Sequence, residues 1–587
     1  MSESLRLTDS LDRARDPMLA AAIGDALGWP VENRSGRVGG ISRVQPRLEF
    51  VDWMRREGGG YAPHQVEVAA GSYSDDTQLI LAVARSRMRG SQWWRHWTDC
   101  ELPLWLLYER GGGGATKRAA QAWNRGLPPW SEENKPSDLN RYWRAGGNGV
   151  AMRVLPHVLV GDPDAFGGIA AHIVADGICT HGHPRALIGA LAHSYALWLA
   201  LKQKGTLGFG ELIERTLDEE DAWAPFPGAV PHLDDWTAQM EIARPPFADE
   251  WKQTRIEMRH LFESCRESLR GGSLAVDRKT LQALGAFDKS VNGAGTIAAA
   301  AAVFLASRYA SRPAQGLMAA AFAKGADTDT IASMTGSLLG AIQQDGWLSG
   351  LKPRLQDASY IEQVASDLAQ NRSVQGPIQP WRQENRKSFL RALAQADEGN
   401  GLSLPIFGRC RIRHRDLPET KSSSKIFEWI MATEAGQTLH VKRVVPTPKK
   451  RAATATQPDP STATPFWIVL RVANLEASQR FYGELFGFPV RENGNSGRLF
   501  VLDRIVLERA AADAPPPPAT EEDLLASRQS ITLFMDTGAL EQMHKKLVSL
   551  EAPVSGVIKR EGRVAFRCAD PDGNVVEVRA GAQLQRS

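Results

Sequence analysis

Hydrophobic residues recur at helical spacing through most of the first 340 residues, with few runs of β-branched residues. Gly336 and Gly340 lie four residues apart within this region, a spacing that lets two helices approach closely. We therefore expect a helical domain over residues 1–376. The stretches that carry the pattern, rich in alanine and other small residues, are 18–26, 79–85, 186–201, 296–310 and 316–340.

Two segments of this region do not follow the helical pattern. Residues 33–70 are glycine-rich and charged, which predicts either a mobile lid over a cleft or simply a long loop. Residues 205–275 place three tryptophans among many charges and resemble an insertion, whose role the sequence leaves open.

The pattern changes after residues 377–381. A helical stretch at 382–395 and a glycine-rich turn at 397–401 precede alternating β-type runs at 404–414, 425–433 and 438–445. Gly436 and Gln437 are typical of a hairpin turn between the last two runs. Residues 377–445 are thus expected to form a helix and a small β module.

Four arginines alternate along the first β-type run of this module. They can contact phosphate, or they can form the solvated face of a small antiparallel sheet, and the second reading is favoured. These residues are Arg409, Arg411, Arg413 and Arg415.

The rest of the chain divides into a linker and another domain. Residues 446–465 are rich in Pro, Thr and Ala and predict a flexible linker. Residues 466–587 show a doubled βαβββ-like pattern, which predicts an α+β domain of paired units. The first unit uses 466–472, 481–487, 499–502 and 505–508, and the second uses 530–535, 540–550 and 564–578.

Composition is that of an ordinary globular protein. The 587 residues are 43% hydrophobic and 23% charged, which is enough for two to four domains. The net charge of +3 gives no electrostatic case for membrane or nucleic-acid binding, and nucleic acid stays an open partner. The five cysteines are widely spaced and read as reduced thiols. We expect a cytoplasmic location, since no signal core or stretch of 18 apolar residues is present.

Carboxylates cluster before two of the predicted helices. Asp75 and Asp76 precede the apolar run 78–84, and Asp327 and Asp329 precede the run 331–341. Acids at helix N-termini are often ordinary caps. Two such clusters with adjacent hydroxyls offer more oxygen ligands than capping needs, which favours Mg²⁺, Mn²⁺ or Ca²⁺ over zinc.

These segments resemble the ADP-ribosylglycohydrolases, a family that includes dinitrogenase reductase-activating glycohydrolase. The resemblance rests on five motifs in order over about 310 residues and spans roughly residues 17–365. It implies an all-α domain with a binuclear Mg²⁺ or Mn²⁺ centre below an ADP-ribose cleft. The motifs are 24–32 (GDALGWPVE), 74–77 (SDDT), 147–153 (GNGVAMR), 180–181 (TH) and 325–330 (GADTDT).

The resemblance also implies roles for individual residues. Glu32 and Asp76 are the expected catalytic residues, with Glu32 for acid/base work. The expected metal ligands are Ser74, Asp75, Asp76, Asp327, Asp329 and Thr330, and the expected substrate-binding residues are Asn148, Gly149, Met152, Arg153 and His181. One departure concerns residues 292–296 (NGAGT), where many relatives carry an aromatic residue against the adenosine.

Residues 466–587 resemble the vicinal oxygen chelate family of glyoxalase and bleomycin-resistance proteins. Members bind metal with one ligand from each of four strands. Trp467 and Ser530 stand at two of these positions, which leaves only Glu508 and Glu577. Two carboxylates rarely hold a catalytic divalent ion alone, so we expect a metal-free domain that binds a ligand or a protein, or serves as structural filler.

Three function classes follow. The leading one is a metal-dependent hydrolase that cleaves the glycosidic bond between ADP-ribose and an acceptor, for which a macromolecular substrate is expected. The others are a hydrolase of free ADP-ribosyl esters or related nucleotides and a non-catalytic ADP-ribose-binding protein. The sequence does not fix the acceptor.

Overall fold

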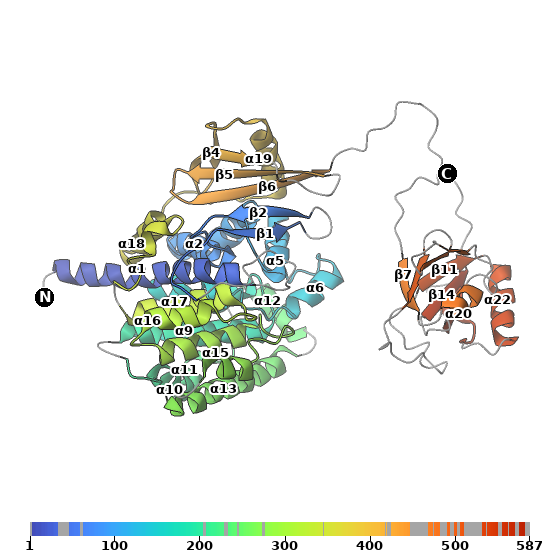
Figure 1. Cartoon of the computed structure of the whole chain (residues 1–587), viewed down its shortest axis with the longest axis horizontal. Coiled ribbons are helices and arrows are strands. Elements are labelled where there is room, and N and C mark those ends of the chain that lie inside the picture. Colours follow the sequence, from blue (N-terminus) through green and yellow to red (C-terminus); the bar gives the residue numbers. More distant parts are fainter. Residues whose placement is uncertain are drawn as a thin grey trace. The chain divides into compact units, whose positions relative to one another are not determined.

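The computed structural model divides into two compact units, residues 1–450 and 451–587 (Figure 1). It describes residues 3–32, 46–58, 63–203, 207–227, 233–242, 246–272, 276–343, 346–416, 418, 424–446, 468–472, 475–481, 490–492, 498–501, 505–509, 531–535, 537–549, 554–560, 563–569 and 575–580.

The first unit is a body of helices with two small sheets. Its helices up to residue 223 are α1 (Glu3–Gly28), α2 (Asp75–Arg87), α3 (Trp93–His96), α4 (Leu102–Trp105), α5 (Gly114–Asn124), α6 (Pro136–Trp143), α7 (Leu155–Leu159), α8 (Phe166–Ile178), α9 (Pro184–Lys202), α10 (Glu211–Asp218) and α11 (Glu220–Trp223). The later helices are α12 (Asp234–Ile242), α13 (Phe247–Arg270), α14 (Asp277–Ala283), α15 (Gly295–Arg308), α16 (Pro313–Ala321), α17 (Thr328–Ile342), α18 (Ala358–Ala369) and α19 (Gln383–Gln395). Short 3-10 or π turns cover Trp29–Val31, Gly90–Gln92, Trp97–Glu101, Ala151–Arg153 and Lys352–Arg354.

The predicted helical domain is confirmed, with one break. The expected stretch 316–340 is two helices, α16 and α17, because the chain turns at 322–327 before the acidic motif. Gly325 has a φ of +99°, which a side chain disfavours. This turn directs Asp327 and Asp329 to the start of α17.

The antiparallel pairing of α1 and α17 forms the centre of the unit. Small residues occur at every fourth position of the contact on both helices. A Cβ at Gly24 would lie 2.2 Å from the Ala332 carbonyl oxygen, and one at Gly336 would lie 2.2 Å from that of Ala20. The backbones therefore pack without intervening side chains, and the end of α1 lies beside the start of α17.

The segment predicted as a lid or loop contains a hairpin. β1 (Trp53–Glu57) pairs antiparallel with β2 (His64–Val68), while residues 33–45 and 59–62 lie outside the described residues. Trp53 packs edge-to-face on Trp29, with ring centroids 5.3 Å apart. The described part is thus ordered structure packed on the end of α1.

The second sheet of this unit is the predicted β module with one more strand than expected, because the run expected at 404–414 is interrupted by a turn at 405–407. Its strands, β3 (Gly401–Leu404), β4 (Gly408–Asp416), β5 (Ser424–Thr433) and β6 (Thr438–Pro446), form an antiparallel meander in that order. The hairpin turn at 436–437 is confirmed, and Gly436 has a φ of +106°. Lys442 of β6 forms an ion pair with Glu57 of β1, and Figure 1 shows the two sheets on the same side of the helical body.

The arginine alternation on β4 is interrupted. The register shifts between Ile412 and His414, so Arg409 and Arg411 are exposed while Arg415 stacks near the rings of Phe427 and Trp429. The four guanidinium groups therefore do not form one continuous row.

The second unit, described by itself, has the predicted doubled pattern, although its first described helix ends at Gln479 and the helix expected at 481–487 lies almost wholly outside the described residues. Each of its two sheets has the strand order first, fourth, third, second, counted along its repeat. The first and fourth strands are parallel neighbours. The first repeat holds β7 (Ile468–Val472), α20 (Leu475–Gln479), β8 (Val490–Glu492), β9 (Arg498–Val501) and β10 (Ile505–Arg509). The second holds β11 (Ile531–Met535), α22 (Thr537–Ser549), β12 (Ile558–Arg560), β13 (Arg563–Ala569) and β14 (Val575–Ala580). The short strands β8 and β12 were not predicted.

The predicted linker lies almost wholly outside the described residues. Within the part of the chain that the structure describes, no helix is long and apolar enough to cross a membrane.

The close contact of α1 and α17 predicts that a side chain at Gly336 destabilises the protein. We expect Gly336→Ala to lower the free energy of unfolding by about 1 to 3 kcal/mol, because its Cβ meets backbone that cannot move without separating the helices. The matched control is Gly168→Ala on α8, where a Cβ meets nothing within 4 Å and stability should stay level or rise. Denaturant unfolding followed by tryptophan fluorescence measures both, and equal effects would contradict the packing argument.

Candidate acidic metal centre

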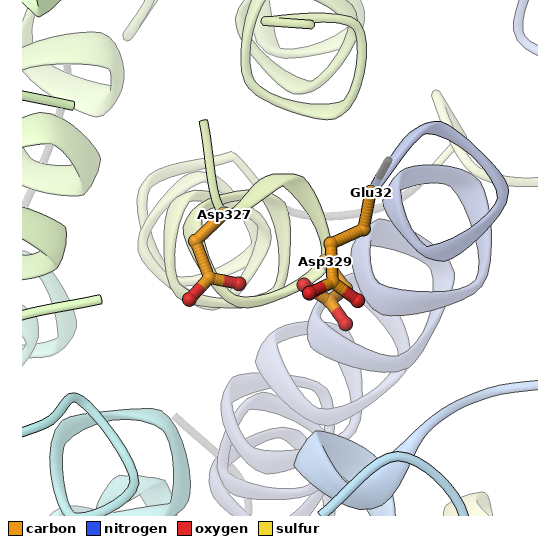
Figure 2. Close-up of side chains that lie close together, drawn as sticks. All are labelled: Glu32, Asp327 and Asp329. Carbon is orange, nitrogen blue, oxygen red and sulfur yellow. The ribbon is translucent and has the colours of Figure 1, made fainter. Parts of the chain in front are cut away.

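Three carboxylates meet where α1 ends and α17 begins. Oxygens of Glu32, Asp327 and Asp329 all lie within 4.8 Å of one another. Glu32 follows the 3-10 turn 29–31, and its backbone N–H donates to the carbonyl oxygens of Gly28 and Trp29. Figure 2 shows Glu32 coming from the end of α1 and the two aspartates from the start of α17, with their carboxylates close together.

The start of α2 brings the second acidic motif to the same place. Ser74 caps α2, and its Oγ accepts from the Asp76 N–H at 3.2 Å. The Thr330 hydroxyl of α17 donates to Asp76 Oδ2 at 3.3 Å. The other oxygen of Asp76, Oδ1, is buried and has no hydrogen-bond partner. The motifs around 75 and 328, far apart in sequence, thus meet as predicted.

Asp25 supports this segment and was not among the predicted site residues. Its carboxylate accepts from the Ser74 N–H at 3.0 Å, the Thr77 N–H at 3.1 Å and the Thr77 hydroxyl at 2.6 Å. Asp25 is fully buried on α1. A charged residue between Gly24 and Ala26 in an apolar helix was the signal available in the sequence.

Burial and mutual repulsion dominate the electrostatics. Burial, followed by repulsion from Asp25 and Asp75, raises the pKa of Asp76 well above its usual value. Burial, followed by repulsion from Glu32 and Asp327, raises the pKa of Asp329 well above its usual value. Burial is also the main cause of the raised pKa of Asp75, ahead of its acidic neighbours.

This donor set fits a hard divalent cation. It offers carboxylate and hydroxyl oxygens, repelling charges that a cation would neutralise, and the unpartnered Asp76 Oδ1. A purely structural cluster would leave that oxygen at a free-energy cost of about 1–3 kcal/mol. The expected ligands Ser74, Asp75, Asp76, Asp327, Asp329 and Thr330 all lie at the joined starts of α2 and α17.

The expected substrate-binding residues lie on a neighbouring loop. Asn148 Nδ2 donates to Asp327 Oδ2 at 3.0 Å, and the Asn148 backbone N–H donates to the Gly293 carbonyl oxygen at 2.9 Å. Gly149 has little space, since a Cβ there would lie 3.0 Å from both the His181 ring and the Thr116 hydroxyl. The structure therefore joins Asn148 directly to the acidic cluster.

Arg153, Met152 and His181 lie behind that loop. Arg153 is fully buried, pairs with Asp176, and donates to the Gly149 carbonyl oxygen at 2.6 Å. Met152 is also buried. Burial lowers the pKa of His181 to about 3, so its ring is neutral at physiological pH. In this conformation Arg153 holds the Gly149 carbonyl and is closed to solvent.

A pocket of about 500 Å³ adjoins Glu32 and Asp327. No Phe, Tyr or Trp is among the described residues that line it, which agrees with the departure at 292–296. Its glycine-rich walls come from residues 146–147 and 292–294, and its polar side chains include Arg144, His183, Arg185 and Lys289. A pocket with cationic groups beside an acidic centre suits a ligand that carries phosphates.

In the C-terminal unit, Glu577, one of the two remaining ligand candidates, forms an ion pair with Arg567. Glu577 is buried, and its Oε2 accepts from Arg567 Nε at 2.6 Å across the β13–β14 pair. The side chain of Glu508 and residues Trp467 and Ser530 lie outside what the structure describes. The buried carboxylate of Glu577 is thus already neutralised by a cation of the protein itself.

The raised carboxyl pKa values predict how stability depends on pH. The unfolded Asp76 ionises near 3.8, whereas the folded, metal-free protein holds that proton to higher pH. The stabilisation is therefore complete below 3.8 and is lost as the pH rises through the raised pKa. We expect the melting temperature of chelator-treated protein to fall as the pH rises above 3.8, because the unfolded chain then releases protons that the folded protein still holds.

Asp76→Asn should make that fall shallower because the amide never ionises. The exposed Asp162→Asn is the control and should follow the wild type. Identical pH profiles for the wild type and Asp76→Asn would refute the assigned repulsion.

Comparison with known protein families agrees with the helical N-terminal region and the separate C-terminal domain. Residues 464–578 match the Glyoxalase/Bleomycin resistance protein/Dioxygenase superfamily. A solved structure titled "ADP-ribosylglycohydrolase-related protein complex" is 21% identical, covering 62% of this chain and 99% of its own at a TM-score of 0.39. Lactoylglutathione lyase from Agrobacterium tumefaciens is 21% identical (22% and 100% coverage, TM-score 0.16). Fosfomycin resistance protein FosX from Listeria monocytogenes is 15% identical (21% and 98%, TM-score 0.18).

No match to the chain was found among curated proteins. Residues 6–378 match the family described as ADP-ribosylglycohydrolase, and this match covers more than half of the chain. The protein therefore belongs to the ADP-ribosylglycohydrolase family, whose members hydrolyse ADP-ribose linkages, and carries a glyoxalase/bleomycin-resistance-like domain after that match.

Proposed function

We propose that the protein is a metal-dependent hydrolase that cleaves the glycosidic bond between ADP-ribose and a macromolecular acceptor. The observation that carries the proposal is the convergence of Glu32, Asp327 and Asp329 beside a pocket with cationic side chains. A pair of Mg²⁺ or Mn²⁺ ions bound there would supply positive charge that orients ribose hydroxyls and makes water more acidic.

The protein's own residues supply the rest of the chemistry. Cleavage at the ribose C1 passes through an oxocarbenium-like state, so one group must move a proton to or from water or the leaving group. Glu32 lines the pocket and is only partly buried, so it can reach both a ligand and solvent. Asp76 is buried deeper and holds the segment by its hydrogen bond from Thr330. We assign the proton transfer to Glu32.

The cationic side chains of the pocket suit the diphosphate of ADP-ribose. Arg144 and Lys289 are exposed. Arg185 Nε donates a hydrogen bond to Glu257 Oε2 at 2.8 Å, which fixes the position of its guanidinium group. Guanidinium and ammonium groups bind phosphate oxygens by charge-assisted hydrogen bonds. Asn148, fixed to Asp327, connects this pocket to the acidic centre.

The buried acids argue against a pure binding role. Several carboxylates with raised pKa values destabilise a fold unless a cation or a reaction uses them. The macromolecular acceptor is supported by the additional C-terminal domain, which hydrolysis of a small ester would not require.

A panel of substrates tests this function. ADP-ribose linked to arginine, to serine, to a nucleic-acid base and in a free ester should be assayed with Mg²⁺ and again with a chelator. We expect hydrolysis of at least one macromolecular conjugate, lost with chelator and restored by metal. Asp327→Ala should abolish it because a metal-ligand charge is removed, whereas the exposed Asp162→Ala should not.

The other outcomes decide between the alternatives. Turnover of the free ester alone would establish a small-molecule hydrolase. ADP-ribose binding without turnover of any conjugate would establish a binding protein, and full turnover in chelator by metal-free protein would refute metal dependence.

The role of Glu32 has its own test. We expect Glu32→Gln to keep ADP-ribose affinity and to lower kcat by about two to four orders of magnitude, the usual contribution of a positioned acid or base. The amide keeps the shape but cannot exchange the proton. Calorimetry measures the affinity and single-turnover assays the rate; a fully active Glu32→Gln would transfer the role to Asp75 or Asp76.

A further inference from the structure

A short loop before α18 packs against the segment that leads into the acidic centre. Gly71 has a φ of +83°, and a Cβ there would lie 2.0 Å from the Arg354 carbonyl oxygen. The Gln356 N–H donates to the Gly71 carbonyl oxygen at 3.0 Å. The backbone at 71–73 is therefore in direct contact with the loop 354–357.

Asp357 connects this segment to the β module. Its Oδ2 accepts from the Tyr73 hydroxyl at 2.7 Å and from the Thr438 N–H at 2.8 Å, and its Oδ1 accepts from the Thr438 hydroxyl at 2.7 Å. We call these three hydrogen bonds the Asp357 bridge. Tyr73 directly precedes Ser74, and Thr438 is the first residue of β6.

The backbone of Asp357 is unusual in a way that fits this connection. Its φ of 56° lies in the left-handed region, which non-glycine residues rarely adopt. A residue there persists when surrounding contacts fix it, at a free-energy cost of about 1 kcal/mol or more. The carboxylate contacts of Asp357 supply that fixation.

A second contact joins the same hairpin to the middle of α2. Arg85 NH1 donates to Gln437 Oε1 at 2.7 Å and to the Tyr360 hydroxyl at 3.1 Å. The same guanidinium pairs with the buried Glu101. Gln437 therefore contacts α2 directly, and Thr438 is connected through Asp357 to Tyr73, two residues before α2.

We infer that Tyr73, Asp357 and Thr438 are positioning residues for the acidic centre. The β module, which lies outside the family match, thereby helps to hold Ser74, Asp75 and Asp76 in place. This inference rests on the proposed function for its catalytic consequence, since the bridge acts through the proposed metal ligands.

The segment that carries Asp75 and Asp76 is restrained from two sides. Asp25 of α1 accepts hydrogen bonds from the Ser74 N–H and the Thr77 N–H. The Asp357 bridge holds the same segment through Tyr73, which directly precedes Ser74.

Tyr73→Phe in the full chain tests the bridge, with Tyr309→Phe as the matched control. Tyr309 also donates to an aspartate, Asp277, at 2.6 Å, but it lies at the far end of α15 from the centre. Both variants lose one tyrosine–aspartate hydrogen bond. The readouts are hydrogen exchange of the amides at 74–78, Mn²⁺ affinity by calorimetry, and kcat and KM.

We expect exchange at 74–78 to rise about 2- to 10-fold in Tyr73→Phe, as one lost hydrogen bond implies. Mn²⁺ affinity should fall about 10-fold, the usual effect of removing a group that orients ligands, and kcat should fall with KM little changed. Thr438→Val should reproduce these changes from the β module, and Thr438→Ser, which keeps the hydroxyl, should not. Tyr309→Phe should leave all of them at wild-type values.

The outcomes separate this inference from the proposed function. Wild-type exchange and Mn²⁺ affinity in both Tyr73→Phe and Thr438→Val would overturn the inference while leaving the hydrolase assignment intact. A wild-type protein that hydrolyses no conjugate would overturn the assignment, and hydrogen exchange at 74–78 would still decide whether the bridge positions the segment.

Discussion

The backbone contact between α1 and α17 is the constraint on which the candidate site depends. Gly24 and Gly28 of α1 face the carbonyls of Ala332 and Thr328, so no side chain separates the two helices. Thr328 also donates its hydroxyl to the Gly28 carbonyl oxygen at 2.8 Å. Glu32 and Asp327 can share one cation only if the ends of these helices stay this close. The small residues of the core thus fix the separation of the acidic ones.

The same close contact brings negatively charged side chains together, which destabilises their ionised forms. Carboxylates from α1, α2 and α17 lie together in a region with little solvent, and their pKa values rise because of burial and mutual repulsion. The surrounding hydrogen bonds, from Ser74 and Thr77 to Asp25 and from Thr330 to Asp76, offset part of this cost. Such a cluster lowers the stability of the metal-free protein and raises its affinity for a cation.

The sequence predicted the parts of the site that are local in the chain. Acids, hydroxyls and glycines in short motifs identified both helix starts, and the glycine spacing at 336 and 340 predicted the close helix contact. The motif located the start of α17, but the end of α16 and the turn at 322–327 were not predicted, because small apolar residues at helical spacing continue on both sides of the turn. The register shift at Ile412 was missed because alternation in a sequence does not reveal a bulge.

The residues that hold the acidic segment in place could not be predicted, because their partners are distant in the sequence. Asp25, Asp357 and Thr438 contribute through contacts across 49 to 284 positions of sequence. Asp357 and Thr438 belong to no local pattern, and the motif that contains Asp25 does not reveal its partners. Arg567 likewise gave no signal of its pairing with Glu577, since the two meet only through the β13–β14 register. Long-range contacts of this kind depend on the folded arrangement of elements rather than on composition.

The ion pair of Lys442 with Glu57 and the contact of Gln437 with Arg85 have a consequence for how such chains evolve. The family match ends at 378, yet buried polar groups of α2 find their partners in residues that follow it. Recombination at that boundary would leave Arg85 without Gln437. A gene fusion that keeps these contacts must therefore carry residues beyond the family match, within the first unit, residues 1–450.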